Sequence, residues 1–167
     1  MYLCNQAKTI SIMKYLKITL ASIAVLAIYF IYLYIPNRII ISGNDNFGQS
    51  ANDPHLGILQ IQYWDKWIPY KSIDTLNRRF YFENSRMDVQ NAFISNAKSK
   101  FVVDDVEAIL TFSAIEAGND KTFVRYECVI NNRTFSPIAR IHNYQSSKIM
   151  EKELAVIMQA AKKHYAK

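Results

Sequence analysis

The longest apolar stretch of the chain lies near its N-terminus. Residues 18–35 contain no charged side chain, and ten of these 18 are Ile, Leu, Val or Phe. A helix of that length is about 27 Å long, close to the roughly 30 Å thickness of a bilayer's hydrocarbon core. Tyr29, Tyr32 and Tyr34 gather at its C-terminal end, where aromatic belts lie, and Pro36 follows. The pattern predicts one transmembrane helix over residues 18–35.

The charges on either side of this run predict its orientation. Lys8, Lys14 and Lys17 precede it, whereas only Arg38 follows closely. The positive-inside rule then places residues 1–17 in the cytoplasm as a short tail and the rest of the chain outside. A cleaved signal peptide requires a shorter apolar region followed by small residues. Tyrosines and Pro36 follow instead, so we expect an uncleaved anchor in a bacterial inner membrane, with translation from Met13 an alternative to Met1.

Turn-forming residues dominate the segment that follows the apolar run. Asn, Asp, Gly and Ser recur over residues 36–56, a composition typical of loops. We therefore expect a tether over 36–56. Residues 57–167 then form a single extracytoplasmic domain in the periplasm.

Alternation of apolar and polar residues predicts most of the domain's strands. The expected strands are Gly57–Tyr63, Ile68–Ser72, Asn77–Glu83, 106–114, 124–130 and Arg133–His142. Pro137 favours an edge position for the last of these. Cys128 faces inward and Arg125 outward on the strand at 124–130.

Two stretches instead have helical spacing. Ser85 and Asp88 resemble a capping box, which predicts a helix that ends near residues 98–100. A second helix begins at Ser146 or Ser147. Its predicted buried stripe consists of Met150, Leu154, Ile157, Met158, Ala161 and Tyr165. The predicted fold class is α+β: an antiparallel sheet with two helices on one face, in the order strands–α–βββ–α.

The overall charge is +6 with a pI of about 9.3, which suggests a nucleic-acid partner at first sight. Four of the basic residues, however, flank the apolar run: Lys8, Lys14, Lys17 and Arg38. Without them the chain has 16 basic and 14 acidic residues. The basic excess is therefore mainly a topology signal, and we expect no nucleic-acid binding.

Catalytic and metal-binding patterns are sparse. On the predicted topology Cys4 and Cys128 lie on opposite sides of the membrane and form no disulfide. The three histidines have no metal-ligand spacing, so we expect neither a metal nor another cofactor. Cys128 with His142 as its base is a possible nucleophilic pair, but apolar neighbours favour core packing. We expect no catalytic residues and therefore no enzymatic activity.

Two groups of residues are candidates for binding a partner. Trp64, Trp67 and Tyr70 lie in one short segment, and Trp and Tyr are enriched at interfaces, although these rings could equally fold over the core. The second group, expected on one sheet face that could also be plain solvated surface, consists of Arg125, Glu127, Arg140 and His142.

The sequence thus predicts a single-pass inner-membrane protein whose non-enzymatic periplasmic domain binds a protein. The partner would belong to an envelope or secretion complex, or would be a periplasmic toxin that this chain inhibits as an immunity protein. The alternative is a periplasmic small-ligand binder or an enzyme that uses Arg125, Glu127, Arg140 and His142. The oligomeric state stays open.

Overall fold

The computed structural model of the protein describes residues 2–47, 54–92, 96–117 and 121–165. Its helical elements are α1 (Tyr2–Tyr34), α2 (Pro54–Leu59), the 3-10 helix η1 (Ile61–Tyr63), α3 (Trp64–Trp67) and α4 (Pro137–Tyr165). Its strands are β1 (Arg38–Phe47), β2 (Ser72–Asp74), β3 (Arg79–Tyr81), β4 (Ser85–Ala92), β5 (Asn96–Val103), β6 (Val106–Ala117) and β7 (Lys121–Asn131).

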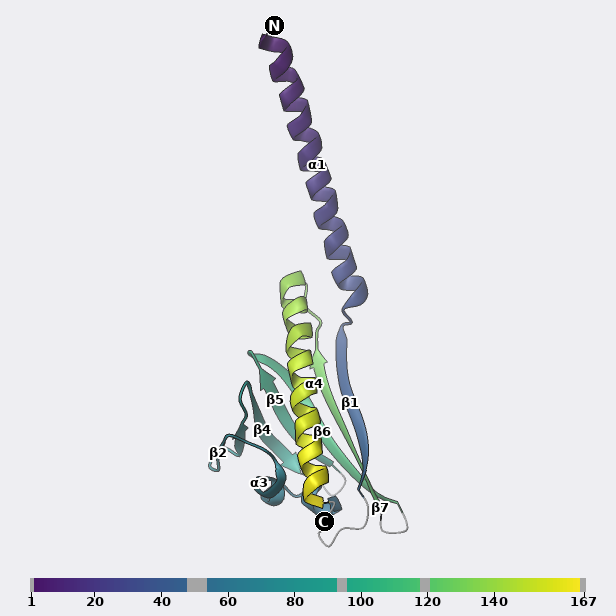
Figure 1. The fold of residues 1–167 in the computed structure, drawn as a ribbon, viewed down its shortest axis with the longest axis vertical. Helices are drawn as coiled ribbons and strands as arrows, with labels where there is room; N and C mark the ends of the chain where they lie inside the picture. The colour runs from purple at the N-terminus through teal and green to yellow at the C-terminus, as the bar shows by residue number, and fades with distance from the viewer. Residues whose placement is uncertain (1, 48–53, 93–95, 118–120, 166–167) are drawn as a thin grey trace.

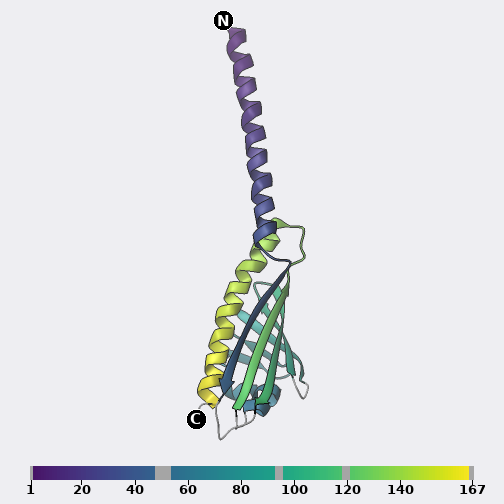
Figure 2. The ribbon, with the colours of Figure 1, turned by 90° about the vertical axis from the view of Figure 1, so that its right-hand side faces the viewer.

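All seven strands form one antiparallel sheet in the order β1-β7-β6-β5-β4-β3-β2. β1 pairs with the last strand, from Arg38 opposite Asn131 to Phe47 opposite Thr122. The sheet curves around α4, which lies along its inner face (Figures 1 and 2). The short helices α2, η1 and α3 lie at the end of the sheet away from α1 (Figure 1).

The core lies between the sheet and α4. Inward-facing side chains alternate along the central strands, and the fully buried ones include Phe101, Leu110, Phe112, Val124 and Cys128. The buried stripe predicted for the last helix is confirmed, because all six of its residues are buried on α4. The predicted strands at 106–114 and 124–130 are confirmed as parts of β6 and β7, and the predicted strand Asn77–Glu83 contains β3.

The predicted strand Arg133–His142 is wrong, because α4 begins at Pro137. Ser136 caps this helix: its Oγ accepts a hydrogen bond from the Ala139 amide at 3.3 Å. Proline suits the first helical position, where its missing N–H has no partner to lose. The same Pro137 that suggests an edge strand is therefore a helix-start signal.

The predicted helix that begins at Ser85 is wrong, because β4 and β5 occupy this segment and residues 93–95 lie outside the described part. Met87 and Val89 face the core from β4, and Ala97 does so from β5. Outward-facing Asp88 makes ion pairs with Arg86 on its own strand and with Arg79 on β3. The two-residue period is thus real, although Val89 and Ala97 also fit helical spacing.

The strands predicted at Gly57–Tyr63 and Ile68–Ser72 are also wrong. The first segment forms the end of α2 and all of η1, and β2 begins only at Ser72. The class of the fold, α+β with an antiparallel sheet, is confirmed. The arrangement of two helices on one face is wrong, because one long helix packs along the sheet.

The predicted tether is wrong for residues 38–47, which form β1 in the sheet; residues 48–53 lie outside the described part. The predicted span falls within α1. Of the described helices, α1 alone is long and apolar enough over Met13–Tyr34 to cross a membrane by length and composition. Its large apolar side chains in this stretch are mostly exposed, and α1 contacts α4 near its own C-terminal end.

Candidate functional site

Trp64 and Trp67, predicted as interface residues, are core residues. The Nε1 of Trp64 donates to the Ile58 carbonyl at 2.8 Å, and that of Trp67 donates to the Gly57 carbonyl at 3.1 Å. Both indoles therefore satisfy carbonyls in the last turn of α2, which have no partner within the helix. The ring of Trp64 also packs edge-on against Phe112. The alternative interpretation of the sequence, in which the two tryptophan rings pack in the core, is therefore correct.

Tyr70 is half-buried and lies beside the same aromatic cluster. Its ring packs edge-on against Phe80 at 5.5 Å between centroids. All three aromatic candidates therefore support the wall formed by α2, η1 and α3 against the sheet.

The structure does not bring Arg125 and Glu127 together with Arg140 and His142. Arg125 and Glu127 lie on the outer face of β7, paired with each other at 3.3 Å. Arg140 and His142 lie on α4, not on a strand. The ring Nε2 of His142 contacts the Asp104 carbonyl at 3.0 Å. A binding face made of all four residues does not exist.

Arg140 instead joins α4 to the end of α1. Its Nε donates to the Ile35 carbonyl at 3.0 Å, and its guanidinium lies 4.6 Å from the Tyr32 ring centroid. The side chain is buried, and no carboxylate among the described residues pairs with it. The partial negative charge at a helix C-terminus and the face of an aromatic ring both stabilise a cation.

Cys128 is fully buried on the inner face of β7. Burial raises the pKa of its thiol to about 12, so the thiolate is scarce at neutral pH. Together with the position of His142 on the surface of α4, this favours core packing for Cys128. Among the described residues, no three His, Cys, Asp or Glu side chains lie close enough together to hold a metal ion.

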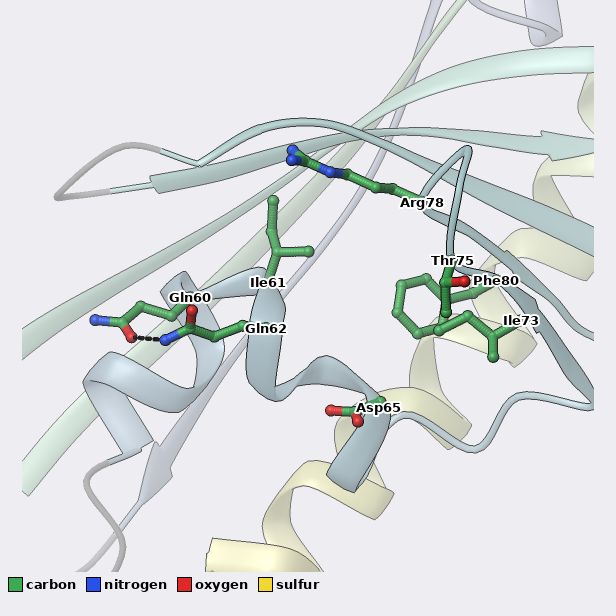
Figure 3. A pocket seen from close by; sticks show the side chains of 8 residues that line it. All are labelled: Gln60, Ile61, Gln62, Asp65, Ile73, Thr75, Arg78 and Phe80. Atoms are coloured by element: carbon green, nitrogen blue, oxygen red, sulfur yellow. Dashed lines mark hydrogen bonds between the residues drawn. The ribbon is translucent and has the colours of Figure 1, made fainter.

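The strongest candidate site is a cavity of about 520 Å³ between two parts of the fold. The η1 region forms one side, and the β2–β3 hairpin forms the other (Figure 3). The residues that line it are Gln60, Ile61, Gln62, Asp65, Ile73, Thr75, Arg78 and Phe80. Its size is in the range of sites for small molecules, and it combines apolar side chains with a few polar ones.

Arg78 is the cation of this cavity, and the turn before β3 fixes its place. Asp74 accepts hydrogen bonds from the backbone and side-chain nitrogens of Asn77 at 3.1 and 2.7 Å, and these bonds lower the pKa of the Asp74 carboxyl. The Arg78 carbonyl accepts a bond from the Val89 amide at 3.0 Å. Arg78 itself has φ of 51°, a left-handed conformation that is uncommon outside glycine.

The polar groups of the cavity are separated in space. Arg78 reaches across the cavity toward the side where Ile61 lies, and Asp65 lies on the opposite side (Figure 3). Gln62 donates to the Gln60 side chain at 2.9 Å, which holds the two amides together. Within the described part of the chain no ion pair reaches Arg78, so its guanidinium is available to an anion.

A second cavity, of about 430 Å³, lies between α4 and the β1–β7 edge of the sheet. Its charged groups pair with each other, because Lys162 donates to Asp45 at 2.5 Å. Tyr126 lies in this cavity directly over Gly43, and burial raises the pKa of its phenol. Since its cation and anion neutralise each other, this cavity offers a ligand less than the first one does.

Sequence reasoning misses the cavity because one of its sides comes from a wrongly predicted element. Gln60 and Gln62 belong to a predicted strand that the structure replaces with α2 and η1, whereas Arg78 lies in the predicted strand that contains β3. The Asp74–Asn77 pair is a turn signal, but nothing in the sequence places Arg78 opposite Ile61.

No family model and no curated protein matches the sequence. Solved structures do match its fold. Ara h 8.0201 has a TM-score of 0.56 at 7% identity, over 76% of this chain and 97% of its own. An uncharacterised protein from Bacillus thuringiensis has a TM-score of 0.55 at 8% identity, over 77% of this chain and 100% of its own. A START superfamily protein from Mycobacterium smegmatis has a TM-score of 0.46 at 14% identity, over 75% of this chain and 96% of its own.

The domain therefore shares a helix-grip fold with the first two of these structures: a curved antiparallel sheet wraps around a long C-terminal helix. Identities of this size show the fold alone. The structure overturns the prediction of a protein-interaction domain, whether as an envelope or secretion accessory or as an immunity protein, because Trp64 and Trp67 lie in the core and the predicted four-residue face does not form. That prediction rests on the apolar anchor, a complete small fold and the sparse catalytic patterns of the sequence. The predicted alternative, a small-ligand binder, agrees better with the structure, although not through the residues named for it.

Proposed function

We propose that the domain binds a small amphipathic anion in the cavity between η1 and the β2–β3 hairpin. The observation that carries the proposal is the Arg78 guanidinium, which forms no ion pair with a described residue and extends toward Ile61 in a cavity that Ile73 and Phe80 also line. Apolar burial supplies affinity, and a charge-assisted hydrogen bond to Arg78 fixes the orientation of the ligand. Asp65 repels an anionic group from the opposite side, which favours a single binding direction.

The proposal includes a binding role without catalysis. Among the described residues that line the cavity, Asp65 is the one carboxylate, and none is a histidine or a cysteine. General acid–base chemistry on a ligand commonly requires a second titratable group within hydrogen-bond reach. The lining is better suited to holding a ligand than to converting it.

The proposal also includes α1 as a membrane span, with the domain on the periplasmic side of a bacterial inner membrane. Support comes from the length and apolar composition of Met13–Tyr34 and from the lysines that precede it. Such an anchor keeps the binding domain at the membrane surface.

The test uses the full chain in lipid nanodiscs and isothermal titration calorimetry. The probe is 4-phenylbutyrate, and its neutral control is 4-phenylbutanamide. We expect the unmodified protein to prefer the carboxylate. Arg78→Gln should weaken carboxylate binding by about 1–2 kcal/mol, or roughly 5- to 30-fold, and should leave amide binding unchanged.

Arg125→Gln is the matched control, because Arg125 is an exposed arginine on the outer sheet face. It should change neither affinity. Equal affinity for the two probes, or equal effects of the two substitutions, would contradict the proposal.

A further inference from the structure

The domain exposes large apolar side chains at its end nearest to α1. Phe135, in the loop between β7 and α4, is 99% exposed, and Ile138, in the first turn of α4, is 80% exposed. We call these two residues the tip patch. Tyr34, the last residue of α1, is 74% exposed. Such side chains mark an interaction site where they gather with others into one patch, so their neighbours decide what they mean.

The tip patch lies beside the C-terminal end of α1. The Tyr32 hydroxyl donates to the Phe135 carbonyl at 2.6 Å. Arg140, which lies about one helical turn after Pro137 on α4, donates to the Ile35 carbonyl. Both ribbon views show the start of α4 next to the last turn of α1 (Figures 1 and 2). The tip patch is therefore close to the tyrosines that end the apolar stretch of α1.

Hydrogen bonds hold the connection between α1 and β1 against the rest of the domain. The Asn132 amide donates to the Asn37 carbonyl at 2.8 Å, and its side chain donates to the Pro36 carbonyl at 3.1 Å. Asn143 on α4 in turn donates to the Asn132 side chain at 2.9 Å. The three residues between α1 and β1 thus leave little freedom for the domain to swing away from the axis of α1.

We propose that Phe135 and Ile138 insert into the interfacial layer of the bilayer that α1 spans, so that the domain stands on the membrane in one orientation. This inference rests on the proposed membrane span. Aromatic and apolar side chains at the level of an aromatic belt lose their water contact in that layer.

The orientation has a consequence for the ligand. β2 and α3 lie in the half of the domain away from α1 (Figure 1). With the tip patch on the bilayer, the cavity between η1 and the β2–β3 hairpin is distant from the lipid. The ligand then arrives from the aqueous phase and not by extraction from the membrane.

The test places one fluorophore at a time on the full chain in nanodiscs of phosphatidylcholine and phosphatidylglycerol. A Cys4→Ser background leaves buried Cys128 as the only native thiol. Phe135→Cys, Leu26→Cys in α1 and Leu76→Cys each receive an environment-sensitive dye, and lipids with nitroxides at shallow or deep acyl positions act as quenchers. Leu76 is the matched control, because it is 94% exposed and lies at the sheet edge opposite β1.

We expect shallow nitroxides to remove most of the emission at position 135, deep nitroxides to do so at position 26, and neither to affect position 76. Quenching at 26 without quenching at 135 overturns this inference and leaves the membrane span intact. A lack of quenching at 26 overturns the span, and the inference with it. A blue-shifted but unquenched dye at 135 shows contact with protein instead of lipid, and also overturns the inference.

Discussion

Replacement of Trp64 tests how the wall of the cavity is held to the sheet. Trp64 is fully buried, and its Nε1–H is the donor for the Ile58 carbonyl. Trp64→Phe keeps a ring against Phe112 but leaves that carbonyl without a partner, which costs about 1–3 kcal/mol. Trp64→Ala also empties the space of a large side chain and should lower the free energy of unfolding by about 3–5 kcal/mol.

The assay is urea unfolding of the detergent-solubilised full chain in a Cys4→Ser background. Labelling of Cys128 with a maleimide reports unfolding, because this thiol is buried in the folded domain and its signal does not depend on tryptophan. Leu76→Ala serves as the control at an apolar side chain that is 94% exposed and should change stability by less than about 0.5 kcal/mol. If Trp64→Ala unfolds at the urea concentration of the unmodified protein, Trp64 does not hold the wall, and our account of α2 and α3 is wrong.

Three further predictions concern other parts of the fold. A Cβ at Gly43 would lie 2.6 Å from the Tyr126 ring, so Gly43→Ala should destabilise the domain by about 1–3 kcal/mol, and removal of the ring with Tyr126→Ala should relieve the penalty in a double-mutant cycle. Arg140→Met leaves the carbonyl at the end of α1 without a donor, so hydrogen exchange at the Asn132 amide should accelerate; unchanged exchange would refute a role for Arg140 at this junction. Burial raises the pKa of the Cys128 thiol from 9.0 to about 12. The contribution of the neutral thiol to stability is therefore complete below pH 9 and is lost as the pH rises toward 12. Cys128→Ala should remove this part of the pH dependence of the free energy of unfolding, as measured by urea unfolding.

The sequence predicts best where one strand or helix face carries all of the burial. On β6 and β7, inward positions such as Leu110 and Cys128 recur at every second residue, and most positions between them are polar, so the two-residue period is visible even though Ile109 faces outward. The stripe of α4 is equally regular. β4 and β5 escape prediction because Val89 and Ala97 also fit helical spacing, and because the inward position at Ser99 is polar. β4 and β5 are also stabilised by pairing with β3 and β6, and the local pattern of apolar residues does not reveal which strands pair.

The candidate site depends still more on tertiary contacts. Trp64 and Trp67 have the composition of an interface, but their hydrogen bonds to α2 turn them inward. Arg78 has no distinguishing sequence signal, since its left-handed backbone depends on the Asp74–Asn77 contact and on pairing with Val89. Arg125 and Arg140 share a predicted face only if residues 133–142 form a strand. The start of α4 at Pro137 separates them.

The central claim is that a ligand binds between η1 and the β2–β3 hairpin, and the most direct test is to locate the contacts of a bound ligand. Isoleucine methyl groups provide the readout, because Ile61 and Ile73 line the cavity and Ile109 is exposed on the outer face of the sheet. With 4-phenylbutyrate added to the full chain in nanodiscs, we predict nuclear Overhauser contacts from the phenyl ring to the methyl groups of Ile61 and Ile73, and none to Ile109. Contacts to Ile109 alone, or binding with no contact to Ile61 and Ile73, would contradict a ligand site between η1 and the β2–β3 hairpin.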